Sequence, residues 1–100
     1  MEIKFKAGYY EWNVYADGKY FYTFDDIGEL LYEDMENDEE VNGVHKEEPD
    51  YENLENVAEL CLWSMDRHLE EQGAERLGKA DMLRLKSKML EAWSRHYGIY

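Results

Sequence analysis

The sequence predicts an α+β fold in which an N-terminal antiparallel β-hairpin or three-stranded meander is followed by three helices packed on one face of the sheet. Two runs of aromatic and β-branched residues flank Asp17-Gly18 near the start of the chain, and such runs around Asp-Gly are typical of a hairpin. Beyond residue 24, apolar residues recur at helical spacing instead. One hundred residues with 44% hydrophobic residues are enough for a single acidic domain spanning 1–100.

Strands are expected at about 2–6, 9–16 and 19–24. A two-residue type I′ turn at Asp17-Gly18 pairs Tyr15 with Tyr20, Val14 with Phe21, Asn13 with Tyr22 and Trp12 with Thr23. One face then carries Tyr10, Trp12, Val14 and Phe21, and the other carries Tyr15, Tyr20, Tyr22 and Phe24. Both faces are aromatic, so we expect one to pack on the helices and the other to be partly exposed.

Helices are expected at about 24–37, 51–72 and 75–97. Thr23 and Asp26 resemble a capping box for the first helix, which should fade near Asn37. An acidic loop over 38–50 follows, Asp50 is placed to cap the second helix, and Gly73 to stop it. The predicted core faces are Ile27, Leu30, Leu31 and Met35; then Leu54, Val57, Ala58, Cys61, Met65 and Leu69; then Met82, Leu85, Met89, Trp93 and Tyr97.

The net charge of −13 is concentrated in the middle of the chain. Residues 25–59 contain 15 acidic residues and a single basic one, Lys46, whereas the segments before and after are close to neutral. Charge localised in this way indicates a face that repels nucleic acid and membranes and attracts basic surfaces. We therefore expect neither direct nucleic-acid binding nor membrane binding.

The acidic segment suggests a partner. Carboxylates at helical spacing recur every 4.5–6 Å or so, a density near that of a nucleic-acid backbone. The leading hypothesis is an inhibitor that occupies the basic groove of a nucleic-acid-binding protein, in the manner of phage inhibitors of restriction or CRISPR nucleases, an analogy of size and charge alone. The alternative is a solvated helix face beside a flexible loop. The candidate contact residues are Asp26, Glu29, Glu33, Glu36, Asp38, Glu39 and Glu40.

Aromatic residues suggest a second type of function, a regulatory protein-interaction module such as an antitoxin-like or phage accessory adaptor. Trp63 lies opposite the core face of the second helix, and Tyr15, Tyr20 and Tyr22 share one predicted sheet face. If exposed, such side chains are typical interface anchors. Internal packing against a neighbouring helix is the alternative. The basic residues Arg84, Lys88 and Arg95 of the last helix also leave open contact with an acidic patch of a second copy, and so a homodimer.

Catalytic, cofactor and metal sites are not expected. From Asp38 onward the spacing of an EF-hand loop is followed through Gly43, but the twelfth position, where calcium needs a bidentate Glu, is Pro49. The three histidines and Cys61 form no zinc spacing, and no nucleophile with an adjacent base is evident, so we predict a non-enzymatic protein. A single cysteine and an N-terminus without a signal-peptide pattern favour the cytoplasm.

Overall fold

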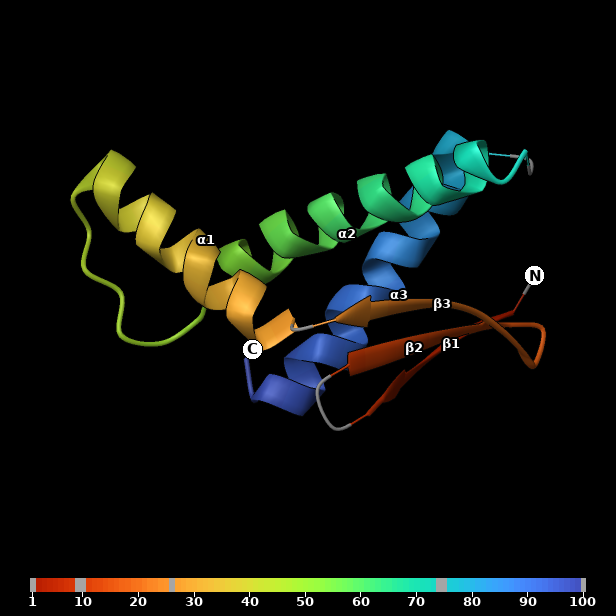
Figure 1. Cartoon of the computed structure of the whole chain (residues 1–100). Helices are drawn as coiled ribbons and strands as arrows, with labels where there is room; N and C mark the ends of the chain where they lie inside the picture. The colour runs from red at the N-terminus through yellow and green to blue at the C-terminus, as the bar shows by residue number, and fades with distance from the viewer. Residues whose placement is uncertain (1, 9–10, 26, 74–75, 100) are drawn as a thin grey trace.

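The computed structural model describes residues 2–8, 11–25, 27–73 and 76–99 and confirms the α+β prediction (Figure 1). The sheet is a three-stranded antiparallel meander in the order β1-β2-β3, and the helices pack on one of its faces. The elements are β1 (Ile3–Ala7), β2 (Glu11–Ala16), β3 (Lys19–Asp25), α1 (Ile27–Asn42), α2 (Tyr51–Glu71) and α3 (Lys79–Tyr97).

The turn between β2 and β3 forms where the sequence predicts it. Asp17 and Gly18 both have positive φ, 50° and 81°, as a type I′ turn requires. Glycine adopts this conformation without strain, and aspartate tolerates it better than most residues. The turn sets Ala16 opposite Lys19 and Tyr15 opposite Tyr20, which is the predicted register.

The predicted register is wrong beyond Tyr20, because the ladder skips Phe21 at a β-bulge. Val14 pairs with Tyr22 instead of Phe21, and Trp12 with Phe24. Since side chains alternate along a strand, one extra residue exchanges the two faces beyond it. Tyr22 and Phe24 therefore lie on the helix-facing side, not on the outer side as predicted. Tyr10, assigned by the sequence to the inner face, lies outside the described residues.

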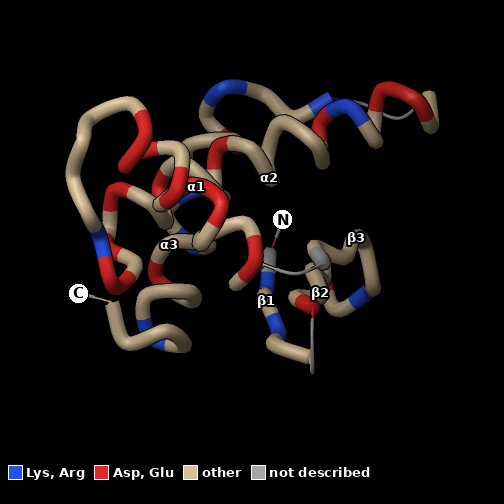
Figure 2. Tube along the Cα trace, turned by 60° about the vertical axis from the view of Figure 1, so that its left-hand side comes forward, with Lys and Arg blue, Asp and Glu red and all other residues tan. Residues whose placement is uncertain are grey.

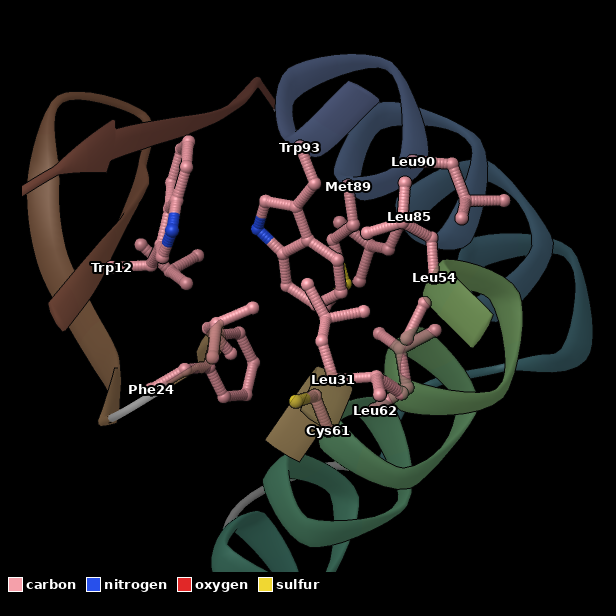
Figure 3. Packing of buried hydrophobic residues seen from close by; sticks show 14 of the residues in the cluster. Trp12, Phe24, Leu31, Leu54, Cys61, Leu62, Leu85, Met89, Leu90 and Trp93 are labelled. Carbon is pink, nitrogen blue, oxygen red and sulfur yellow. The ribbon is translucent and has the colours of Figure 1, made fainter. Parts of the chain in front are cut away.

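The core fills the space between the sheet and the three helices (Figure 3). Trp93 of α3 is fully buried at its centre, and its ring makes edge contacts with Trp12 and Phe24 across the layers. All the predicted core residues of α2 are buried. In α1 and α3 the predicted faces are also inward, with Leu30, Met82 and Tyr97 half-buried at the edge.

Two predicted helix boundaries are corrected for α1. The helix begins at Ile27, because Thr23 belongs to β3 and uses its hydroxyl to bond the Asn13 side chain at 2.8 Å rather than to cap a helix. It continues past Asn37 to Asn42 and ends where Gly43 adopts φ 67°. Its far half, with the loop that follows, projects from the body of the protein, at the left in Figure 1.

The other boundaries follow from local hydrogen bonds. Asp50 caps α2 as predicted, in a reciprocal capping box with Asn53. The helix ends at Glu71, just before Gly73 with φ 70°. Helix α3 begins at Lys79 rather than near 75, because Asp66 accepts hydrogen bonds from the Leu77 N–H and the Arg76 side chain and holds this segment against α2.

Candidate partner-binding surface

The solvent-facing side of α1 carries a row of carboxylates. Glu29, Glu33, Glu36 and Glu40, here called the acidic stripe, lie four, three and four residues apart and are all exposed. At 1.5 Å rise per residue the stripe is about 16 Å long. Figure 2 shows acidic positions recurring along α1. Because the helix continues to Asn42, Glu40 lies on the helix in line with the other three glutamates and not in the predicted loop, whereas Asp26 lies outside the described residues.

Within the described ranges, the acidic stripe has no internal partners, a property that it shares with a few scattered glutamates such as Glu11 and Glu71. Among the described residues, no ion pair or hydrogen bond involves the side chains of these four glutamates. Many carboxylates on the other elements are engaged: Lys86 binds Glu55 and Glu59 at 2.9 and 2.7 Å, and Arg95 binds Glu91 at 2.7 Å. The negative charge of the stripe is therefore not neutralised by any described basic side chain of the protein.

Two other predicted contact residues are used inside the molecule. Asp38 is half-buried and pairs with Lys46, whose ammonium also lies 3.3 Å from Asp50 at the start of α2. The hydrogen bond to Lys46 lowers the pKa of Asp38, and the same bond raises the pKa of Lys46. Glu39 contacts the ring of His45 at 2.9 Å. These contacts hold the loop after α1 against the helix. Because both carboxylates have internal partners, we do not count them in the acidic stripe.

A small groove with mixed polar and apolar lining adjoins the acidic stripe on the side of α2. Glu33 lies on its rim, and Leu60 of α2 is 49% exposed beside it. One turn further along α2, Trp63 is 54% exposed, with the Arg67 guanidinium 4.9 Å from the centre of its ring. The groove is lined by Leu30, Glu33, Asp34, Asn37, Asn56, Val57 and Leu60. Trp63 lines a separate pocket, but it follows Leu60 by one turn of α2 and so lies next to the groove.

The predicted tyrosine face is divided by the bulge. Tyr15 and Tyr20 remain together on the outer side of the sheet, with ring centroids 6.2 Å apart and Tyr20 62% exposed. Tyr22 faces the helices, where its ring packs on Phe24 at 5.2 Å and on His68 at 5.0 Å. Tyr22 stays half-buried and lines a surface pocket with Trp63 and Arg67, whereas Tyr15 and Tyr20 are on a different face from Trp63.

Sequence reasoning missed Arg67 and the groove. The spacing of Leu60, Trp63 and Arg67 by three and four residues was a usable signal, because such residues share one helix face. The groove itself had no signal in the sequence, since it depends on how α1 lies across α2.

The structure also places the cysteine and the EF-hand-like segment. Cys61 is buried, and burial raises the pKa of its thiol to about 12, far from a reactive thiolate. Within the described ranges, no group of three or more His, Cys, Asp and Glu side chains is arranged to hold a metal ion. Residues 38–42, where the EF-hand-like spacing starts, are helical rather than part of a loop. None of the described helices is both long and apolar enough to cross a bilayer.

Comparison of the chain with protein-family models, with curated proteins and with solved structures finds no match. The surface itself is therefore the basis for a functional proposal.

Proposed function

We propose that this protein is a binding inhibitor that inserts α1 into the basic groove of a nucleic-acid-binding protein and competes with nucleic acid for that groove. The observation that carries the proposal is the acidic stripe, four exposed carboxylates in a row without partners among the described residues. Their axial spacing of roughly 4.5–6 Å is similar in scale to the charge spacing along a nucleic-acid strand.

The charge pattern of α1 works against the stability of the helix. Glu29 and Glu33, and Glu36 and Glu40, are like charges four residues apart, each pair costing about 0.2–0.5 kcal/mol. Glu39 and Glu40 lie near the helix C-terminus, where the macrodipole disfavours negative charge, and the last turn contains no basic residue. If the only role of this surface were to stay solvated, a mixture of acidic and basic residues would do equally well. An interaction with a basic partner would offset these unfavourable terms.

The groove beside the acidic stripe supports the same proposal. A basic groove approaching the acidic stripe also reaches Leu60 and Trp63, because Glu33 and Leu60 line one depression. Charged contacts accelerate association and tune specificity, whereas a desolvated tryptophan contributes more of the binding energy. The two features complement each other in one interface.

A second candidate function, an adaptor for a partner without a nucleic-acid role, is favoured by the exposure of Trp63 and Leu60. It differs from the inhibitor in which residues matter. Neutralising the acidic stripe would hardly change adaptor binding, whereas replacing Trp63 with alanine would abolish it.

The experiment is affinity capture with the immobilised protein, followed by elution with duplex DNA or RNA and by a salt gradient. We expect a nucleic-acid-binding protein that DNA or RNA displaces. Capture should be lost in the quadruple variant E29Q/E33Q/E36Q/E40Q. The matched control E2Q/E11Q/E71Q/E91Q removes the same charge from exposed sites on other elements and should still capture the protein.

Two results would count against the inhibitor. Equal capture by both quadruple variants would show that the acidic stripe is not the contact. A partner that resists salt, ignores DNA and RNA, and is lost only with Trp63→Ala would support the adaptor instead.

A further inference from the structure

A cleft of the opposite charge lies between β1 and α3. Lys4 and Lys6 project from β1, and Lys88 and Arg95 line the facing side of α3. The floor is apolar, with Phe5 and Ala92, and Glu91 is the one acidic residue in the lining. In Figure 2, basic positions are visible on β1, the strand at the far edge of the sheet from α1. We call this feature the basic cleft.

The strand that forms one wall of the basic cleft has a free edge. β1 pairs with β2 on one side, and no described strand lies on its other side. Asp17 N–H bonds the Glu2 carbonyl, and Gly8 N–H bonds the Glu11 carbonyl. Antiparallel ladders alternate between bonded and non-bonded pairs, so Lys4 and Lys6 also direct their backbone groups to β2. The N–H and C=O of Phe5 and Ala7 therefore point outward, and Phe5 is in the basic cleft itself.

The wall on α3 is a helix stripe. Lys88, Glu91, Ala92 and Arg95 are spaced by three, one and three residues and lie on one side of the helix. Arg95 binds Glu91 at 2.7 Å, yet the Arg95 side chain stays 75% exposed. On the strand, Lys4 is 66% exposed beside Glu2, and Lys6 lies over the Tyr15 ring at 5.2 Å. Lys4, Lys6 and Arg95 are thus anchored but accessible.

We propose that the basic cleft binds an extended acidic peptide segment of a partner protein, which adds to the free edge of β1 as a fourth strand. Outward backbone groups give main-chain hydrogen bonds to an extended chain, the mode known as strand addition. Lys4, Lys6, Lys88 and Arg95 select for acidic side chains on that chain. This site is separate from the acidic stripe and does not depend on the function proposed for it.

A second copy of this protein fits the edge poorly. In a symmetric antiparallel pairing of two β1 strands centred on Phe5, Lys4 of one copy would lie opposite Lys6 of the other. Like charges directly opposite each other are destabilising in a sheet. Lysines on an edge strand generally discourage self-association, and here they leave an acidic strand as the favourable occupant.

The net charge of −13 does not prevent an acidic peptide from binding here. The acidic stripe belongs to α1, which follows β3 at the other edge of the sheet. Two inter-strand spacings separate the edges by about 9.5 Å, and the Debye length at physiological salt is about 8 Å. The cations of the basic cleft therefore dominate the field that a docked peptide experiences.

The test uses a short fluorescein-labelled peptide in which pairs of glutamates and pairs of valines alternate, so that both faces of the extended chain carry carboxylates, measured by fluorescence anisotropy. We expect saturable binding that weakens about five- to tenfold in each of the double variants K4Q/K6Q and K88Q/R95Q. The control K19Q/K79Q, which removes two cations outside the basic cleft, should bind as the wild type does. The same peptide with N-methylated backbone at alternate residues should not bind, and amide exchange at Phe5 should slow in the complex.

Three results would overturn the proposal. Equal binding of the N-methylated peptide would show charge attraction without strand addition. Equal affinity of all the variants for the peptide would show that the basic cleft is not the site. A wild-type dimer in sedimentation that the K4Q/K6Q variant loses would make the edge a self-association surface.

Discussion

Asn53 donates a hydrogen bond from Nδ2 to Oδ2 of Asp34 at 2.7 Å, and so joins the first turn of α2 to the middle of α1. The same side chain accepts from the Asp50 N–H and completes the capping box. Asn53 is 1% exposed, so all of its polar atoms depend on these partners. One residue thus fixes where α2 begins and how the helix that carries the acidic stripe lies on it.

Replacing Asn53 with alanine should lower the free energy of unfolding by about 1–3 kcal/mol, because the cap is lost and the Asp34 carboxylate loses its closest donor. Urea denaturation measures the change. Asn56→Ala is the control, since Asn56 donates to the same carboxylate at 3.4 Å from an exposed position and should cost less than about 0.5 kcal/mol. Equal losses in the two variants would contradict the role given to Asn53.

Neutralising the end of the acidic stripe should stabilise the protein. E36Q/E40Q removes a repulsive pair and a negative charge near the C-terminus of α1, and we expect a gain of about 0.5–1 kcal/mol at low ionic strength. Glu29→Gln should gain less, because Glu29 is in the first turn, where the favourable dipole interaction offsets its repulsion from Glu33. Urea denaturation at low and high salt measures both, and high salt should reduce them. A destabilised E36Q/E40Q variant would show that these two glutamates do not lower the stability of the protein.

Asp66 should contribute to stability in a pH-dependent way. The hydrogen bond from Arg76, and less strongly that from the Leu77 N–H, lowers the pKa of Asp66 below its ordinary 3.8. A depressed pKa means that the stabilisation is present above the unfolded-state pKa and is lost as pH falls through the folded-state pKa. Asp66→Asn should therefore be less stable than the wild type at neutral pH, and the difference should shrink below about pH 4.

Urea midpoints of both proteins across this pH range test the prediction for Asp66. Glu91→Gln breaks a fully surface ion pair and serves as the control, with little effect at any pH. A difference between Asp66→Asn and the wild type that stays constant with pH would show that its cause is not the ionised carboxylate.

Cys61 should be unreactive in the folded protein. With a thiol pKa of about 12, the thiolate fraction at pH 8 is on the order of a thousandfold below that of a free cysteine. Labelling with a thiol reagent such as DTNB should therefore be slow in buffer and fast in concentrated guanidinium. Rapid labelling of the native state would show that the sheet and α2 separate readily at this position.

Amide exchange along β1 should alternate. Lys4 and Lys6 N–H groups bond to β2 and should exchange slowly, whereas those of Phe5 and Ala7 face the free edge and should exchange fast in the absence of a peptide. Hydrogen exchange followed by NMR resolves each amide. Uniform protection along the strand would mean that something else already covers the edge.

The fold was predictable because local signals agreed with the global arrangement. Asp17-Gly18 sets the hairpin, Asp50 caps α2, and the apolar faces of all three helices point inward as their spacing indicates. The bulge at Phe21 was not predictable in this way. Both possible registers place aromatic residues on both faces, so the hydrophobic pattern could not choose between them.

The extent of the candidate surface depended on tertiary contacts. The acidic run after Asn37 has the composition of a loop, but Lys46 bonds Asp38 and Asp50 and allows the helix to continue. Lys46 is isolated in the sequence, and its partners are eight residues before it and four after. No local sequence pattern indicates that the Lys46 side chain contacts both Asp38 and Asp50. The free edge of β1 is likewise a property of the strand order and not of any one segment.

The contact between Trp12 and Trp93 has a consequence for the synthesis of the chain. The hairpin can form as soon as its residues leave the ribosome, but Trp12 and Phe24 lack their contacts with Trp93 until α3 emerges. At about 5–20 residues per second, the interval is on the order of several seconds. During that time an exposed Trp12 and Phe24 are available to chaperones or to neighbouring nascent chains.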